Sequence, residues 1–166
     1  DLTGEDLPVE VSLTAVVQEG RRLLHGVMRD ITDKKRAEEN LRESEEKHRL
    51  LIEHAVSGVA VHRIVLDPSG KPVDYIYLSV NPAFERHTGL RADDVIGRRV
   101  TEILPGIEKT PFIDVYAQVV TSGEAISFEQ YSEPLGRHFF INAYRLSEGV
   151  FATVFTDITE RKTMEE

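Results

Sequence analysis

Residues 80–90 read VNPAFERHTGL, and this stretch decides how the rest of the chain is interpreted. Asn81 before Pro82 is typical of a helix start, because an Asn side chain caps free backbone N–H groups and Pro suits the first helical position. Gly89 is typical of a helix end. The stretch therefore predicts a short helix that directly follows a strand.

The segments on either side of this helix predict a mixed pattern of strands and short helices. An antiparallel pair of strands is expected at 58–66 and 73–80, joined by the turn at 67–70. Further helices are expected at 92–96, 101–104 and 112–120, and three closing strands at 125–131, 137–146 and 150–157. The order predicts an α+β fold with a five-stranded antiparallel sheet.

Two stretches of the chain nearly repeat each other: RDITDKKRAEE at 29–39 and TDITERKTMEE at 156–166. Each follows a predicted strand and opens a charged helix. An acidic residue stands three positions after each aspartate, at Asp33 and Glu160, which resembles a capping box with Asp30 and Asp157 as N-caps. Both stretches therefore predict the same strand-to-helix junction.

Residues 8–31 predict a hairpin with its turn at 18–20. Its first strand alternates apolar with mostly polar residues. The apolar members are Val9, Val11, Leu13, Ala15 and Val17, with Leu24 and Met28 on the returning strand. Two strands alone are marginal in water, so we expect them to pack against the same hairpin of a second chain, against the helix that follows or against the outer face of a neighbouring sheet. We favour the second chain's hairpin.

A long helix is expected at about 34–55. One set of its residues is spaced 4-3-4-3-4, which is a weak heptad seam with two polar members. These seam residues are Ala37, Leu41, Ser44, His48, Leu51 and Ala55. A pair between Glu38 and Arg42 fits the favourable helical spacing. The helix is thus either a parallel coiled coil in a homodimer or a solvated helix with one apolar side.

Composition excludes several classes of function. The net charge of −9 argues against phosphate-directed nucleic-acid binding, and the absence of Cys removes disulfides, thiolate catalysis and Cys-ligated metal sites. No apolar run approaches the length of a membrane span, and no signal peptide opens the chain. We therefore expect a cytoplasmic fragment of a longer protein, with no membrane or nucleic-acid contact.

Three stretches resemble a PAS sensor domain: VNPAFERHTGL at 80–90, DDVIGRRVTEILP at 93–105 and VFTDITERK at 154–162. The resemblance covers residues 54–160. The stretch 8–32 resembles the last two strands of a preceding PAS domain. The resemblance implies a tandem arrangement: a hairpin (1–32), a connector helix (33–55), a PAS domain (56–160) and the start of the next connector (161–166).

The resemblance also implies how the domain works, since in this fold short helices cover one face of the sheet and enclose the sensing site. Signal relay is expected at each exit, through Asp30 and Thr32 and through Asp157, Ile158 and Thr159. The expected neighbours are other PAS domains and an output domain of the same chain, such as a histidine kinase or a cyclic-dinucleotide cyclase.

Strand alternation and the family's inward register suggest which residues line the site. The ligand-pocket candidates are Asn81, Phe84, Tyr116, Phe128, Gln130, Phe139, Ile141 and Phe155. Ala143, Phe151 and Thr153 share the inward register. A mainly apolar lining with a few polar groups suits a small ligand. Alternatively, these side chains fill the core, and the domain is a ligand-free dimerisation spacer.

Two cofactors of the family are disfavoured. Flavin photoreceptors of this type form an adduct with a Cys, and this chain has none. Haem-binding relatives hold iron through a His on the longer helix, and residues 108–122 contain no His. His62, Arg63, Glu85 and His87 could be imagined as a metal or acid–base cluster, but a lone His is more often structural. We expect no metal site and no enzyme activity in this chain; a small-molecule ligand remains unidentified.

Overall fold

The computed structural model describes residue 4 and residues 6–165. The chain divides into two compact units, Asp1–Arg49 and Leu50–Glu166. The predicted N-terminal hairpin is confirmed as strands β1 (Val9–Gln18) and β2 (Arg21–Asp30). Its tight turn places Glu19 at a φ of 50° and Gly20 at 76°, as a two-residue hairpin turn of this hand requires. Both strands are exposed along their whole length.

Helix α1 runs from Thr32 to Glu53, two residues earlier at each end than expected. None of its side chains is buried. The expected pair between Glu38 and Arg42 is not the one observed, since the Arg42 guanidinium lies 2.7 Å from Glu39, one helical turn back. Both pairings keep opposite charges on neighbouring turns.

The end of α1 corrects one seam residue, because Ala55 lies beyond the helix. Carbonyl groups at and just beyond the end of the helix accept hydrogen bonds from side chains elsewhere in the domain. The Asn81 amide donates to the Ile52 carbonyl at 3.0 Å, and Arg86 donates to the Ala55 carbonyl at 3.3 Å. The helix therefore ends where its carbonyls find these partners, and Ala55 cannot continue the heptad.

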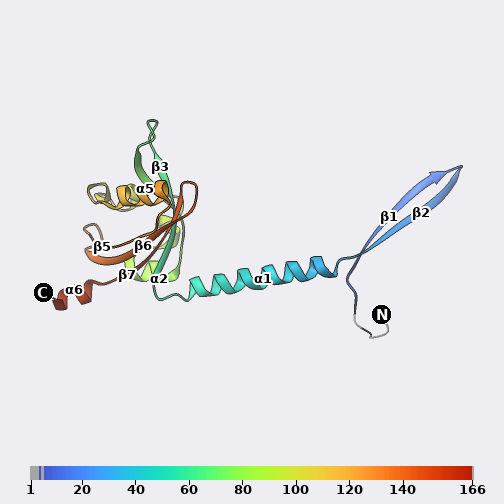
Figure 1. The fold of residues 1–166 in the computed structure, drawn as a ribbon, viewed down its shortest axis with the longest axis horizontal. Coiled ribbons are helices and arrows are strands. Elements are labelled where there is room, and N and C mark those ends of the chain that lie inside the picture. The colour runs from blue at the N-terminus through green and yellow to red at the C-terminus, as the bar shows by residue number, and fades with distance from the viewer. Residues whose placement is uncertain (1–3, 5, 166) are drawn as a thin grey trace. The chain divides into compact units, whose positions relative to one another are not determined.

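The second unit contains one five-stranded antiparallel sheet, as predicted (Figure 1). Its strands are β3 (Gly58–Leu66), β4 (Pro72–Val80), β5 (Ile126–Ser132), β6 (Arg137–Ser147) and β7 (Val150–Asp157). They lie in the order β4-β3-β7-β6-β5. Residues of β3 alternate between buried and less buried positions, and β7 does so except at the buried Ala152; the predicted bounds of both strands agree with the structure.

Short helices connect the two halves of the sheet, and α5 lies against its strands in Figure 1. These helices are α2 (Pro82–Thr88), α3 (Ala92–Val95), α4 (Val100–Ile103), the 3-10 helix η1 (Ile107–Lys109) and α5 (Phe112–Ser122), whereas α6 (Thr159–Glu165) follows the last strand, β7. The sequence did not predict η1. In the part of the chain that the structure describes, no helix is both long and apolar enough to cross a bilayer.

A buried carboxylate fixes the position of α4. Asp74 on β4 is 3 % exposed, and its Oδ2 accepts a hydrogen bond from the Thr101 hydroxyl at 2.5 Å. Its Oδ1 also accepts from the Tyr75 backbone amide at 2.9 Å. Because a buried carboxylate requires such partners, Asp74 holds the start of α4 against the sheet. The helices thereby enclose the apolar core on one face of the sheet.

Candidate ligand cavity

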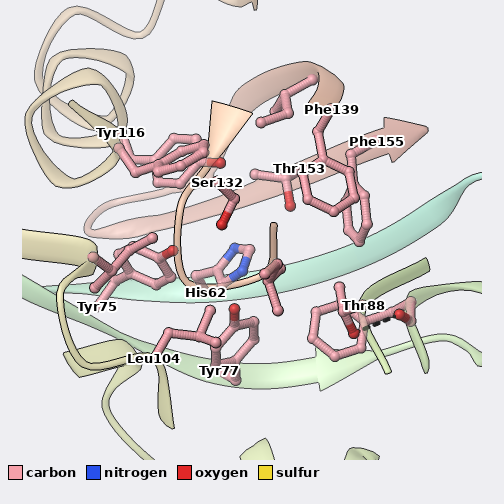
Figure 2. A pocket seen from close by; sticks show the side chains of 15 residues that line it. His62, Tyr75, Tyr77, Thr88, Leu104, Tyr116, Ser132, Phe139, Thr153 and Phe155 are labelled. Atoms are coloured by element: carbon pink, nitrogen blue, oxygen red, sulfur yellow. Dashed lines mark hydrogen bonds between the residues drawn. The ribbon is translucent and has the colours of Figure 1, made fainter. Parts of the chain in front are cut away.

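A cavity of about 60 Å³ lies between the sheet and the helices. Figure 2 shows its side chains, which come from all five strands of the sheet and from the helices that cover one face of it. The lining consists of His62, Tyr75, Tyr77, Phe84, Thr88, Leu104, Ile107, Phe112, Tyr116, Ser132, Leu135, Phe139, Ile141, Thr153 and Phe155. It contains no carboxylate, ammonium or guanidinium group.

His62 is the central polar side chain of this cavity. It occupies an inward position on β3 and is 3 % exposed. Aromatic rings surround the imidazole: ring centroids lie at 4.7 Å for Phe151, 4.8 Å for Tyr77 and 5.1 Å for Tyr75. The Tyr116 ring stacks at 6.2 Å. His62 is therefore a buried core residue.

This burial keeps the titratable groups of the cavity neutral. Loss of hydration lowers the pKa of His62 to about 3, because the charged imidazolium is disfavoured away from water. The same cause raises the pKa values of Tyr75, Tyr77 and Tyr116. Near neutral pH the cavity thus presents an uncharged imidazole and uncharged phenols.

Two buried polar atoms of the lining have no hydrogen-bond partner among the described residues: His62 Nδ1 and Ser132 Oγ. Ser132 ends β5, and its backbone carbonyl accepts from Gly136 at 2.8 Å in the following turn. The serine backbone is therefore fixed while its hydroxyl is left free. Buried polar groups are nearly always partnered, so these two atoms carry hydrogen-bonding capacity that no described protein group uses.

Five of the eight ligand-pocket candidates line the cavity. They are Phe84, Tyr116, Phe139, Ile141 and Phe155, and Thr153 of the same inward register lines it as well. Ala143 and Phe151 belong to the buried core around the cavity and not to its lining.

Asn81 lies outside the lining, and its side chain forms hydrogen bonds to the backbone of neighbouring elements. Its Oδ1 accepts hydrogen bonds from the backbone amides of Val59 at 2.8 Å and Phe84 at 2.9 Å. Its amide donates to the carbonyls of Ile52 and Ser57 at 3.0 and 3.1 Å. The side chain thus caps α2 and joins it to β3 and to the end of α1, and no hydrogen-bonding group remains for a ligand.

Phe128 and Gln130 also lie outside the lining. Both are on β5, the edge strand of the sheet, where the inward side chains before Ser132 are only half-buried. Phe128 packs on Phe112 and Tyr116, with centroid distances of 6.2 and 6.3 Å. The Gln130 amide donates to the neighbouring Tyr131 carbonyl at 3.2 Å, away from the cavity.

The sequence interpretation missed most of the polar side chains of the lining, namely His62, Tyr75, Tyr77, Thr88 and Ser132. One signal for His62 was available, since it shares its side of β3 with the buried Gly58 and Ala60. Period-two alternation alone would have placed the imidazole in the core. Ser132 continues the inward register of Phe128 and Gln130, but it lies one residue beyond the predicted strand.

Gly58 shapes one wall of the cavity. A Cβ atom at this position would lie 2.4 Å from the Phe155 ring, so only glycine lets the end of that ring come this close to the β3 backbone. Phe155 in turn contacts the rings of Phe84 and Phe139 at 5.8 and 5.5 Å. The cavity wall therefore depends on a residue with no side chain.

The junction between β7 and α6 is held by hydrogen bonds. Asp157 Oδ1 accepts from the Thr159 backbone amide at 2.9 Å and from its hydroxyl at 2.5 Å. The same hydroxyl oxygen accepts from the His138 amide at 3.0 Å. Ile158, whose side chain is buried, occupies the N-cap position, since its carbonyl accepts from Lys162. The expected capping box with Asp157 as N-cap is thus wrong.

The junction after β2 has the same geometry. Asp30 Oδ1 accepts from the Thr32 backbone amide at 2.9 Å and from its hydroxyl at 2.5 Å. Lys35 donates to the Ile31 carbonyl, which makes Ile31 the N-cap in place of Asp30. In both junctions the aspartate accepts hydrogen bonds from the threonine that begins the helix, two residues later. In a capping box the aspartate would instead be the N-cap, directly before the first helical residue.

Charged side chains add to the junction at α6. Arg137 donates to Asp157 at 3.2 Å and to the His87 carbonyl at 2.6 Å. Burial opposes ionisation of Asp157, but the Thr159 hydrogen bonds and the Arg137 charge outweigh it and lower its pKa. The carboxylate is therefore ionised near neutral pH.

A second group of charges joins α6 to the edge strand β5. Glu129 accepts a hydrogen bond from Arg161 and pairs with Lys162 at 2.6 Å. These side chains are partly exposed, so each pair contributes little to stability, but together they favour one orientation of the helix start.

Family models match most of the chain. A model described as PAS fold matches residues 64–163, and a second, described as PAS domain, matches residues 1–33. No match was found among curated proteins.

Solved structures share the fold at low sequence identity. A domain of a sensory box sensor histidine kinase/response regulator from Geobacter sulfurreducens is 22 % identical with a TM-score of 0.54, covering 72 % of this chain and 98 % of its own. A LOV protein from Rhodobacter sphaeroides is 14 % identical with a TM-score of 0.53, covering 75 % and 72 %. A PAS domain from Colwellia psychrerythraea is 14 % identical with a TM-score of 0.51, covering 70 % and 98 %.

Proposed function

Because the chain belongs to the PAS fold family, we propose that residues 56–160 form a signal-input and relay module of a multidomain signal-transduction protein. The cavity senses a small molecule or the state of a partner, and α6 carries the change towards an output domain. A histidine kinase or a cyclic-dinucleotide cyclase is the proposed type of output.

One observation carries this proposal: the strands that line the cavity also hold the start of α6. Phe139 and Phe155 line the cavity on β6 and β7. The residue before Phe139, His138, donates its amide to the Thr159 hydroxyl at 3.0 Å, and Asp157 follows Phe155 by two residues. A displacement of either phenylalanine would therefore change the hydrogen bonds that hold the start of α6.

The two junctions support a tandem arrangement. The match of residues 1–33 to a PAS domain and the shared Asp–Thr geometry both fit a hairpin that closes a preceding PAS domain. In this arrangement residues 1–32 belong to that domain, residues 33–55 are the connector, and a second connector begins near residue 161.

A homodimer through α1 belongs to the same proposal. The helix buries no side chain within one chain, and Leu41 and Leu51 are 60 % and 62 % exposed. Ala37, Leu41, Ser44, His48 and Leu51 keep the heptad spacing over the helix as observed. Pairing two such helices would cover the leucines.

The second candidate function is a ligand-free dimerisation spacer, and the size of the cavity favours it. Ligand pockets are usually several hundred Å³, whereas this cavity is about 60 Å³. In a spacer the aromatic side chains simply fill the core, and α6 is held in one position regardless of what enters the cavity.

A substitution that fills the cavity distinguishes the relay module from the ligand-free spacer. Thr153→Leu adds apolar volume on the cavity side of β7, and Val154→Leu makes a comparable change on the other side of the same strand. For a relay module we expect Thr153→Leu, but not Val154→Leu, to change amide hydrogen exchange across residues 159–165. Unchanged exchange in α6 together with altered exchange in the cavity walls would favour the spacer.

A further inference from the structure

The cavity carries unused hydrogen-bonding capacity at two points. His62 is 3 % and Ser132 is 2 % exposed, yet His62 Nδ1 and Ser132 Oγ have no partner among the described residues. Leaving a buried polar atom unpaired costs stability, so natural cores seldom retain two in one cavity. The two residues lie on β3 and β5, on opposite sides of the central strands β7 and β6. Both residues line the same cavity, and Figure 2 shows the Ser132 hydroxyl directed toward the His62 imidazole.

The chemistry of the lining restricts the charge of a guest. Every polar side chain of the lining is a hydroxyl, a phenol or the imidazole. Burial lowers the pKa of His62 to about 3, so the ring offers one donor and one acceptor and no positive charge near neutral pH. An ion placed here would lose its hydration with no opposite charge to compensate, which is strongly unfavourable.

The volume restricts the size of a guest. A cavity needs roughly 10–15 Å³ by this measure to hold one water molecule, and the observed space is about 60 Å³. A guest of about four or five non-hydrogen atoms fits that space. A multi-ring cofactor would require the aromatic walls to move apart.

We propose that the cavity is a binding site for a small uncharged molecule of about four non-hydrogen atoms that carries both a donor and an acceptor, held between Ser132 Oγ and His62 Nδ1. This inference rests on the proposed function, in which the cavity is the sensing site. It adds the chemical class of the ligand: uncharged amides and similar polar molecules, not anions, cations or purely apolar gases.

Three probes of the same size test this class. Acetamide is uncharged and has a donor and an acceptor, acetone has only the acceptor, and acetate is the anion. In a nuclear magnetic resonance titration of the whole chain we expect acetamide to shift the signals of Ser132, Thr153 and Ile141 with saturation. Because so small a molecule binds weakly at best, we expect a dissociation constant on the order of millimolar. Acetone should bind several-fold more weakly, and acetate should show no saturable shift.

The variants Ser132→Ala and Ser127→Ala test whether the Ser132 hydroxyl contacts the bound acetamide. Both serines are on β5, but Ser127 is on the exposed side, where its hydroxyl pairs with Asn142 at 2.6 Å. We expect Ser132→Ala to weaken acetamide binding roughly fivefold, which is the loss of one hydrogen bond, and Ser127→Ala to leave it unchanged. Ser132→Ala should not lower stability without ligand, because it removes an unpartnered buried hydroxyl.

Several outcomes would overturn the inference: acetate or acetone binding as tightly as acetamide, no saturable shift with any probe, or unchanged acetamide binding in Ser132→Ala. These outcomes are distinguishable from failure of the proposed function. If acetamide binds through Ser132 but leaves α6 unchanged, the ligand class holds and the relay fails. If Thr153→Leu changes α6 but no probe binds, the relay holds and the ligand class fails.

Discussion

Asp157 holds Thr159 by two hydrogen bonds from one carboxylate oxygen, at 2.9 Å to the backbone amide and 2.5 Å to the hydroxyl. Asp30 holds Thr32 at the same two distances. The copies differ in their surroundings, because Asp157 also pairs with Arg137, whereas the pKa of Asp30 is lowered by Thr32 alone. The repeated sequence thus encodes a repeated junction, and the second copy is attached to the walls of the cavity.

The buried imidazole makes stability depend on pH. The pKa of His62 is about 3 in the folded chain and near 6.5 when unfolded, so between these values the unfolded state binds a proton that the folded state does not. Stability is therefore fully present above pH 6.5 and falls as the pH decreases towards 3, by up to about 1.4 kcal/mol per pH unit. The titratable groups facing His62 are Tyr75, Tyr77 and Tyr116, which stay protonated in this range.

Urea unfolding followed by circular dichroism at pH 7 and pH 5 checks this prediction. His62→Phe should flatten the pH dependence, whereas His54→Gln, at an exposed histidine outside the core, should leave it as in the unaltered chain. Equal slopes for the two variants would show that the His62 proton does not contribute.

Gly58→Ala should damage the cavity wall. The added Cβ would meet the Phe155 ring at 2.4 Å, so we expect a loss of about 1–3 kcal/mol in the free energy of unfolding, the usual cost of overpacking. Gly26→Ala is the matched control, because it is also within a strand and its Cβ meets only the flexible Leu13 side chain at 3.2 Å. Thermal unfolding of the two variants compares them, and equal midpoints would contradict the tight contact.

Charged substitutions in the heptad seam of α1 test whether the seam is the dimer interface. Leu41→Lys with Leu51→Lys should convert the proposed dimer to a monomer, because two buried ammonium groups would face their own copies in the partner helix. Glu38→Gln with Glu45→Gln changes the net charge equally at neighbouring positions off the seam and should keep the dimer. Light scattering measures the result, and an unchanged oligomer after the leucine replacements would show that the seam is not the interface.

The fold was predictable from the sequence because its signals are local. Alternation gave β3 and β7, and Asn81, Pro82 and Gly89 gave the helix between the halves of the sheet. The end of α1 was less predictable, since it depends on Asn81 reaching the Ile52 carbonyl from a distant part of the sequence.

The cavity was only partly predictable, for a related reason. Inward aromatic residues follow from alternation, but whether an inward side chain meets empty space depends on how the helices pack. Asn81 illustrates the limit, because a buried amide next to the core looks like a ligand contact until all its partners are known. The Ser132 hydroxyl likewise becomes informative only when the structure shows that no described residue bonds to it.

The exposed hairpin gives a further test. Val11, Leu13 and Val17 are 53 %, 64 % and 69 % exposed within one chain. Their apolar surface favours a covering partner, and we propose the hairpin of a second chain. Amide hydrogen exchange across residues 9–17 should then be slow, and exchange as fast as in a free peptide would contradict the proposal.

The most direct test of the relay substitutes a residue of α6 and measures the effect on the cavity, because coupling between two sites must act in both directions. Thr159→Val removes the hydroxyl that joins Asp157 to the His138 amide, and Thr163→Val removes one that bonds only within α6. The measurement is the chemical shift of the Ile141 methyl groups and of the Phe155 ring by nuclear magnetic resonance. We predict that Thr159→Val shifts these cavity signals and Thr163→Val does not; cavity signals unchanged by Thr159→Val would contradict the relay.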